Sequence, residues 1–302
     1  MMVTNNMSER VSYVNGAFLP HSKAYVHIED RGYLFSDGVY EVFEIRQGII
    51  LNFEHHMARL VRSLNGLKIH YAVKQTEIHV LALQLLSHNM LGDAVVYLQI
   101  SRGVAPRGHA FPVPEVIPSV IMTIIELPRN TSQEYEQGVR AITCPDMRWK
   151  RRDLKTISLL PNILAKEEAA QHKAAEAILI EDDQTVTEGS STNLFIVDDA
   201  RVIRTHPANG AILGGVTRQN LIVLAHSTGL IVREEPFSLS DLLKAKEVFL
   251  TSTTKHVLPI TMINDVMIGE GKVGEITRQL MALYEAFIEG QLYMQDAVSH
   301  AG

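Results

Sequence analysis

The order of strand and helix patterns is the feature that most restricts the fold of this chain. Before residue 128, strand patterns such as "VSYVNGAFLP" and "AVVYLQISRG" alternate with helical spacing in "FEHHMARLVRSLNGL". After residue 135 the mixture returns, with strands in "EAILIED" and "EVFLTSTT" and a helix expected at 157–172. This order predicts a mixed α/β protein of the α+β kind.

A polar stretch near the middle divides the pattern in two. The segment "PRNTSQEYEQG" begins at Pro128 and lacks the apolar periodicity of its neighbours, which is typical of a linker. We therefore expect a small N-terminal domain at 1–127, a linker at 128–134 and a larger C-terminal domain at 135–302. A chain of 302 residues suits two domains, and a site could form between them.

Composition and charge exclude several classes of function. The net charge of −6 and the pI near 6.1 do not favour nucleic acid or an anionic membrane surface as a partner. We expect no membrane span and no signal peptide. The single cysteine, Cys144, allows no intrachain disulfide and fits a reducing cytoplasm. His55-His56 lack partners at ligand spacing, so we expect no metal site.

Two charged residues are candidates for chemistry. Lys155, in "RRDLKTISLLPNILAK", is followed at once by apolar residues. It is either a boundary lysine of no consequence or a lysine that points into a site. Glu188 lies in "TVTEGSSTNLF", between two expected strands. A tight hairpin would explain the Gly and Ser residues, but a carboxylate there also suits a protonated ring nitrogen.

Two segments could bind a phosphate. In "AILGGVTRQN", two glycines and Thr217 lead into a helix, whose first N–H groups and dipole favour an anion. The alternative is that Thr217 is only an N-cap. "FLTSTTKHVLP" offers four consecutive hydroxyl residues at a strand end, a composition that ordinary strands also show.

A third segment could bind a carboxylate. "SRGVAPRGHAFP" carries Arg102, Arg107 and His109 in a loop. An arginine fork and a histidine donor suit a small carboxylate, although arginines in surface loops are common. Tyr40 and Arg59 complete the candidates, and they would otherwise be a strand aromatic and the polar edge of a helix.

Together these parts fit one chemistry. A phosphate anchor, a carboxylate, a lysine and a carboxylate-binding loop are what a pyridoxal phosphate enzyme needs. The lysine would form a Schiff base with the cofactor, and the carboxylate would keep the ring nitrogen protonated, so that the ring accepts electrons.

Five motifs occur in one order along the chain: "EDRGYLFSDGVYEV", "RGVAPRGHAFP", "DLKTISLLPNILAK", "TVTEGSSTNLF" and "FLTSTT". With them the chain resembles the fold-type IV (class IV) pyridoxal phosphate aminotransferases, and its Arg-x-His loop resembles that of the D-amino acid transaminases. The resemblance covers nearly the whole chain and implies a two-domain fold-type IV architecture with the active site between the domains and a pyridoxal phosphate-binding C-terminal domain. Ser36 and Lys255-His256 depart from the family pattern.

The resemblance implies a role for each candidate residue. Lys155 would form the Schiff base with pyridoxal 5'-phosphate and shuttle the proton, and Glu188 would pair with the pyridine nitrogen. The other cofactor contacts would come from Arg59, Ser191, Leu213, Val216, Thr217, Ser252 and Thr253. The substrate carboxylate would be held by Tyr40, Arg107 and His109, and the loop would reach in from the partner subunit of a homodimer.

The expected reaction moves the amino group between D-amino acids, such as D-alanine, and 2-oxo acids by a ping-pong mechanism in the cytoplasm. A branched-chain L-amino acid transaminase, an (R)-amine transaminase and an aminodeoxychorismate lyase are alternatives on the same fold. A non-catalytic scaffold is a further alternative, but it would not need Lys155, Glu188 and Arg59 together.

Overall fold

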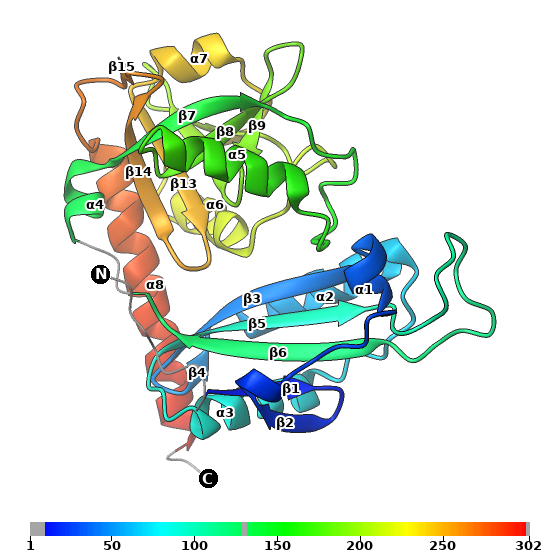
Figure 1. Cartoon of the computed structure of the whole chain (residues 1–302). Coiled ribbons are helices and arrows are strands. Elements are labelled where there is room, and N and C mark those ends of the chain that lie inside the picture. The colour runs from blue at the N-terminus through cyan, green and yellow to red at the C-terminus, as the bar shows by residue number, and fades with distance from the viewer. Residues whose placement is uncertain (1–9, 129–131, 300–302) are drawn as a thin grey trace. The chain divides into compact units, whose positions relative to one another are not determined.

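The computed structural model describes residues 10–128 and 132–299. The chain divides into two compact units (Figure 1). The first consists of residues 1–128 and 154–158, and the second of residues 129–153 and 159–302. Each unit has its own β-sheet and its own hydrophobic core, so the mixed α/β prediction is confirmed.

The first unit is built on an antiparallel six-stranded sheet with the order β2-β1-β6-β5-β3-β4. Its strands are β1 (Val11–Val14), β2 (Ala17–Pro20), β3 (Gly38–Arg46), β4 (Ile49–Ile50), β5 (Ala94–Ser101) and β6 (Ser119–Glu126). The β1–β2 turn falls at Asn15-Gly16, where both residues have a positive φ of 46° and 98°. A type I′ turn needs this backbone, and the strand pattern "VSYVNGAFLP" therefore forms a hairpin.

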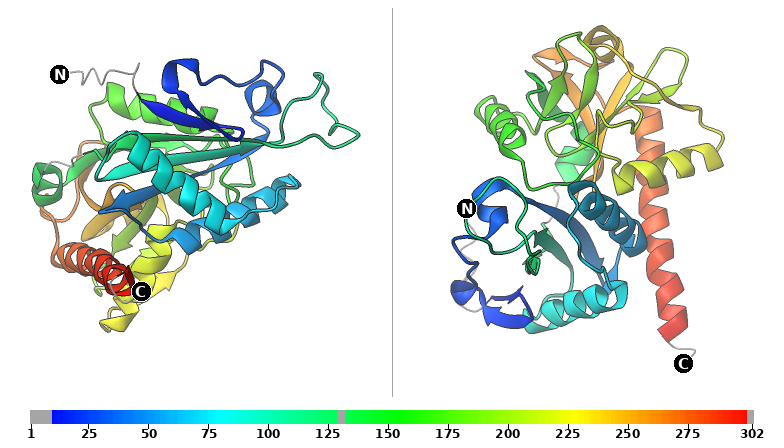
Figure 2. Two further views of the ribbon diagram at one scale, coloured as in Figure 1. Left: turned by 90° about the horizontal axis from the view of Figure 1, so that it is seen from below. Right: turned by 90° about the vertical axis from the view of Figure 1, so that its right-hand side faces the viewer.

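The helices α2 (Phe53–Leu67) and α3 (Gln75–His88) pack on the sheet of the first unit. The unit also contains α1 (Arg31–Phe35) and a short 3-10 turn at His21–Lys23. Figure 2 shows α2 and α3 against the sheet. Met57, Leu60 and Leu64 of α2 are buried at helical spacing in the core that the strands and α3 share. Ser36 ends α1 with a φ of 57°, a conformation that glycine adopts more easily.

The lysine segment belongs to this first unit. The Tyr40 N–H donates to the Lys155 carbonyl at 3.0 Å, and the Ile157 N–H donates to the Gly38 carbonyl at 3.1 Å. Residues 154–158 thus pair with the beginning of β3. The expectation that Lys155 lies in the C-terminal domain is wrong, because this pairing places it with the N-terminal strands.

The second unit contains a nine-stranded mixed sheet, with the order β12-β11-β10-β13-β14-β7-β8-β9 and β15 paired to β14. β7 runs parallel to β8 and β14, whereas β10, β13 and β14 pair antiparallel. Its elements are α4 (Ser132–Gln137), β7 (Val139–Pro145), α5 (Leu160–Gln171), β8 (Glu176–Ile180), β9 (Val186–Gly189), β10 (Asn193–Val197), β11 (Ile203–Thr205), α6 (Val216–Ser227), β12 (Val232–Glu234), α7 (Leu239–Lys244), β13 (Glu247–Ser252), β14 (His256–Ile263), β15 (Val266–Met267) and α8 (Glu275–Ser299).

One expectation about this region needs correction. Within the expected linker at 128–134, residues 129–131 lie outside the described residues, and Ser132 begins the helix α4, so the linker stays a prediction. The helix expected from residue 157 begins at Leu160, with Pro161 in its first turn. It begins later because Ile157 is still paired with β3. Across residues 10–128 and 132–299, the helices are all too short or too polar to cross a membrane.

Candidate active site

Both backbone polar groups of Lys155 are hydrogen-bonded to other parts of the first unit. Its N–H donates to the Ser63 hydroxyl of α2 at 3.1 Å, and its carbonyl accepts the bond from Tyr40. Its side chain is half-buried, and Nζ lies 4.2 Å from the centroid of the Tyr40 ring, within the range of a cation–π interaction. The structure therefore brings together two predicted site residues, and the role of Lys155 in a site stays a prediction.

Arg59 lies in the same unit and has a partner that the sequence did not indicate. Its Nε and Nη2 donate to the two carboxylate oxygens of Glu41 at 2.8 and 2.7 Å. The same carboxylate bonds His56 Nδ1 at 2.8 Å, and all three side chains are buried. Burial alone would raise the pKa of Glu41, but Arg59 and His56 lower it to about 2. Arg59 is thus held rigidly by an ionised carboxylate beside the strand that carries Tyr40.

The residues of the predicted carboxylate-binding loop differ in burial. Arg102 is buried and paired with Asp37, so its expected part in trapping a ligand carboxylate is corrected to a structural one. Arg107 and His109 are exposed and lie near the Phe35 ring. The guanidinium carbon of Arg107 is 5.4 Å from the centroid of that ring, and the centroid of the His109 ring is 5.7 Å from it. Figure 1 shows the segment between β5 and β6, which carries both residues, as a long loop beyond the sheet.

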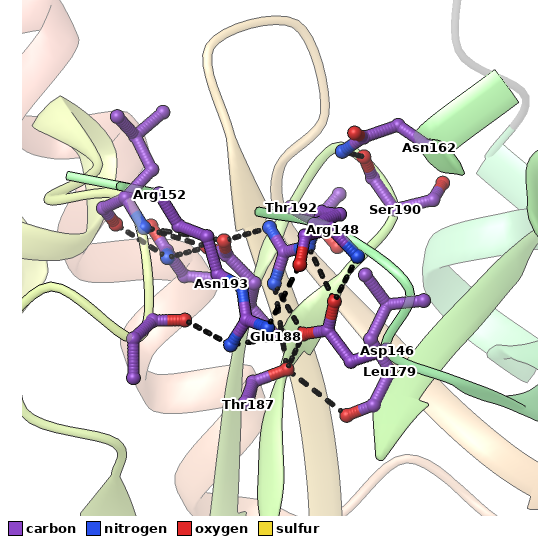
Figure 3. A network of polar contacts seen from close by, with 12 residues as sticks. Asp146, Arg148, Arg152, Asn162, Leu179, Thr187, Glu188, Ser190, Thr192 and Asn193 are labelled. Atoms are coloured by element: carbon purple, nitrogen blue, oxygen red, sulfur yellow. Dashed lines mark hydrogen bonds and ion pairs between the residues drawn. The ribbon is translucent and has the colours of Figure 1, made fainter. Parts of the chain in front are cut away.

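In the second unit Glu188 ends up buried at the end of β9, with several partners (Figure 3). Arg148 donates to one carboxylate oxygen and Asn193 Nδ2 to the other, at 2.8 Å for Asn193. The Leu213 N–H reaches both oxygens at 3.2 Å. Burial raises the pKa of Glu188, and Arg148 and the Leu213 N–H oppose that rise. Glu188 is therefore a fixed acceptor, as a partner of a protonated ring nitrogen must be.

Arg148 is itself oriented by a second carboxylate. Its Nε and Nη2 donate to Asp146 at 3.0 and 2.8 Å, and Thr187 Oγ1 donates to Asp146 at 2.8 Å (Figure 3). Burial alone would raise the pKa of Asp146, but Arg148 and Thr187 lower it. The sequence analysis missed this network, although its signal is an Asp-x-Arg pattern a few residues before Lys155.

The hydroxyl residues that follow Glu188 are held by a buried carboxylate. Ser190 Oγ, Ser191 Oγ and Thr192 Oγ1 all donate to Glu176, the last two at 3.3 and 3.1 Å. Ser191 is exposed, and its hydroxyl is directed to Glu176. These hydroxyls therefore shape the turn at 189–192, and a cofactor contact by Ser191 stays a prediction.

The Gly-Gly segment forms the start of α6. Gly215 is the N-cap, and Val216 and Thr217 are the first two helical residues, so the alternative that Thr217 is the N-cap is wrong. Their N–H groups belong to the first turn, which has no intrahelical partner. A Cβ at Gly215 would overlap the Asn193 amide oxygen. Only glycine allows this approach between α6 and the residue that binds Glu188.

The hydroxyl run at the end of β13 lies in the same unit. β13 packs against α6, and Thr251 is paired with Asn193 of β10. The Thr251 Oγ1 is buried and has no partner among the described residues. Ser252 and Thr253 are half-buried, and Ser252 Oγ accepts from the Lys255 N–H at 3.2 Å.

These features fit a phosphate-bearing cofactor with a basic ring nitrogen. The buried Glu188, the first turn of α6 and the unpartnered Thr251 hydroxyl supply an acceptor, N–H donors and a further polar group within one unit. Asn193 connects them, since Nδ2 also donates to the Leu213 carbonyl at 2.8 Å. Sequence reasoning did not identify Asn193, which stands inside the quoted motif "TVTEGSSTNLF".

Comparisons with known proteins agree with this site. The family model described as amino-transferase class IV matches residues 38–263. The D-alanine aminotransferase of Staphylococcus epidermidis is 41% identical over 279 residues, which cover 92% of this chain and 97% of that protein. The D-alanine aminotransferase of Bacillus licheniformis is 40% identical over 266 residues, 88% of this chain and 93% of that protein.

Solved structures show the same fold. The branched-chain amino acid aminotransferase of Escherichia coli has a TM-score of 0.83 and 24% identity, covering 90% of this chain and 92% of that one. A hypothetical aminotransferase from Mycobacterium tuberculosis in a PLP-bound form has a TM-score of 0.77 and 21% identity, covering 91% and 98%. This chain therefore belongs to the class IV aminotransferase family, and the resemblance inferred from its motifs is confirmed.

Proposed function

We propose that this protein is a D-amino acid transaminase that moves the amino group between D-amino acids, such as D-alanine, and 2-oxo acids with pyridoxal 5'-phosphate. The observation that carries the proposal is the exposed pair Arg107 and His109 on one loop, because these two donors suit the carboxylate of an amino acid. Two relatives named D-alanine aminotransferase, which match most of the chain, support it.

The cofactor would be held largely by the second unit. Glu188 would accept a hydrogen bond from the pyridine nitrogen. The phosphate would lie at the start of α6, where the N–H groups of Val216 and Thr217 belong to an uncapped first turn. The hydroxyls of Ser252 and Thr253 would add further donors. When bound, the cofactor supplies an electron-accepting ring that stabilises negative charge on the substrate α-carbon.

Two more residues of the second unit would contact the cofactor. The backbone of Leu213 is bonded to Glu188 through its N–H, which supports a place for its side chain against the ring. Ser191 would line that side through the turn that Glu176 shapes.

The first unit would supply the reactive amine. Lys155 Nζ would bind the cofactor covalently and, once released by the substrate amine, would move the proton at the substrate α-carbon. Tyr40, 4.2 Å from Nζ, would stabilise the protonated amine through its ring and contribute to the carboxylate site. Arg59 would bind the phosphate in the orientation that Glu41 imposes.

A homodimer is part of the proposal. Val113 and Ile117, beside the Arg107 segment, are 95% and 89% exposed, and Tyr25 and Ile28 are exposed apolar side chains of the same unit. Exposed apolar side chains of this size are typical of protein interfaces. A second copy of this chain would bury them and would receive the Arg107 loop. One half-buried thiol, Cys144, supports a cytoplasmic location.

Replacing Arg107 by alanine tests the proposal. A charge-assisted hydrogen bond contributes about 1.5–3 kcal/mol, so we expect the KM for D-alanine to rise about 10- to 100-fold. An amine without a carboxylate should be affected little. Arg62→Ala, which removes an exposed arginine of α2, is the matched control. A wild-type KM for D-alanine in Arg107→Ala would contradict the proposed substrate class. A wild-type enzyme that turns over L-leucine but not D-alanine would contradict it as well.

A further inference from the structure

The loop that presents Arg107 and His109 is held from inside by a buried arginine of α1. The Arg31 side chain is 4% exposed, and its Nη1 donates to the Gly108 carbonyl at 2.7 Å and to the Ala110 carbonyl at 3.3 Å. These two carbonyls lie on either side of His109, and the first directly follows Arg107. The position of Arg31 therefore fixes the backbone from which both donors project.

A second buried arginine holds the start of the same loop and contacts a ring near its middle. Arg102 stands where the loop leaves β5, and it donates to the carbonyls of Lys68 and Leu67 at 2.7 and 2.8 Å, at the end of α2. Its guanidinium carbon lies 3.7 Å from the centroid of the Phe111 ring, which stands near the middle of the loop, just after His109. Such stacking of a guanidinium on a ring is favourable. Arg102 thus ties the start of the loop to α2 and to the Phe111 ring of the same loop.

One carboxylate joins the two arginines. Asp37 Oδ2 accepts from Arg31 Nε at 2.8 Å and from Arg102 Nε at 2.7 Å, and Oδ1 accepts from Arg102 Nη2 at 3.0 Å. The Arg102 N–H also donates to the Asp37 carbonyl at 3.0 Å. Without this carboxylate, two buried guanidinium groups would lie close together with no negative charge between them, an unfavourable arrangement.

We propose that Asp37 is a positioning residue for substrate recognition, which sets the place of Arg107 and His109 through Arg31 and Arg102. The inference rests on the proposed function, because it assumes that Arg107 binds the substrate carboxylate. Asp37 itself contacts neither substrate nor cofactor in this account. Its effect should therefore fall on the affinity for carboxylate substrates and not on the cofactor or on the turnover number.

Asp37→Asn is the decisive variant, since it keeps the size of the side chain and removes its charge. We expect the KM for D-alanine to rise about tenfold or more, with kcat within about threefold and the cofactor absorption unchanged. Trypsin cleavage after Arg107, measured on the folded holoenzyme, should become about tenfold faster because the loop is released. Glu115→Gln, which removes an exposed carboxylate further along the same loop, is the control and should behave as the wild type.

Arg31→Lys provides a second variant in case Asp37→Asn does not fold. Lysine keeps the charge beside Asp37 but cannot reproduce the guanidinium bonds to both the carboxylate and the loop carbonyls. We expect the same direction of change in KM and in cleavage after Arg107. A folded variant with wild-type KM and wild-type cleavage overturns the inference, and so does faster cleavage with an unchanged KM. If Arg107→Ala also leaves the KM unchanged, the proposed substrate site fails; if Arg107→Ala raises it, only the inference about Asp37 fails.

Discussion

Replacing Glu41 by glutamine tests how strongly the buried network of the first unit stabilises the protein. Glu41 is fully buried and accepts two hydrogen bonds from Arg59 and bonds His56. Burial alone would raise its pKa, but Arg59 and His56 lower it from 4.5 to about 2. One pKa unit corresponds to about 1.4 kcal/mol. The ionised carboxylate therefore contributes about 3 kcal/mol to the free energy of unfolding.

The sign of this shift sets the pH at which the effect is seen. Because the pKa of Glu41 is lower in the folded state than in the unfolded state, the stabilisation is present above about pH 4.5 and is lost as the pH falls toward about 2. We expect Glu41→Gln to lower the free energy of unfolding by about 3 kcal/mol at neutral pH. The difference from the wild type should shrink progressively in acid.

Urea denaturation of the holoenzyme at neutral pH, followed by circular dichroism, measures this difference. Arg59→Met leaves Glu41 buried without its guanidinium, which costs about 3–5 kcal/mol for a broken buried pair. The double variant should lose less than the sum of the two single variants. Glu126→Gln, at the exposed end of β6, controls for the loss of one charge. A Glu41→Gln variant within about 1 kcal/mol of the wild type, or additive single variants, would refute the reasoning.

Two further predictions concern the second unit. Arg148→Met should weaken cofactor binding about 10- to 100-fold, because Glu188 would lose its guanidinium partner and burial would raise its pKa further. Titration of the apoprotein with pyridoxal phosphate measures the affinity, and an unchanged affinity contradicts the prediction. Gly215→Ala should lower the stability by about 1–3 kcal/mol, since a Cβ would overlap Asn193. Gly214→Ala, whose Cβ would meet its nearest atom at 3.4 Å, is the control, and equal melting temperatures for the two variants would count against the overlap.

The parts of the fold that local sequence determines could be predicted. The hairpin at Asn15-Gly16 depends on two adjacent residues that tolerate positive φ. The turn between β3 and β4, at Gln47-Gly48, has the same basis. The helix at 53–67 follows from apolar residues at 3.6-residue spacing, and the structure has it as Phe53–Leu67. Each of these signals is contained in a short window of the chain.

The remaining features depend on pairs of residues that are distant in sequence. The segment around Lys155 pairs with β3, more than a hundred residues earlier. Pro161 is a local signal for the helix start at Leu160, but the pairing that keeps Ile157 out of the helix has none. The local sequence is typical of a polar helix edge for Arg59 and of a surface loop for Arg102. In the structure Arg59 is buried against Glu41, and Arg102 is buried against Asp37. The packing of α2 on β3 and the pairing of β3 with β5 decide which carboxylate meets which arginine, and one sequence reveals neither.

The absorption spectrum of the purified protein tests the central claim most directly. We expect a visible cofactor band that is lost on addition of D-alanine and that persists with L-leucine. Lys155→Ala should lack the band that depends on the covalent bond to the lysine. Loss of the band with L-leucine and not with D-alanine would contradict the D-amino acid specificity. The absence of any cofactor band, even after added pyridoxal phosphate, would contradict the proposed roles of Lys155 and Glu188.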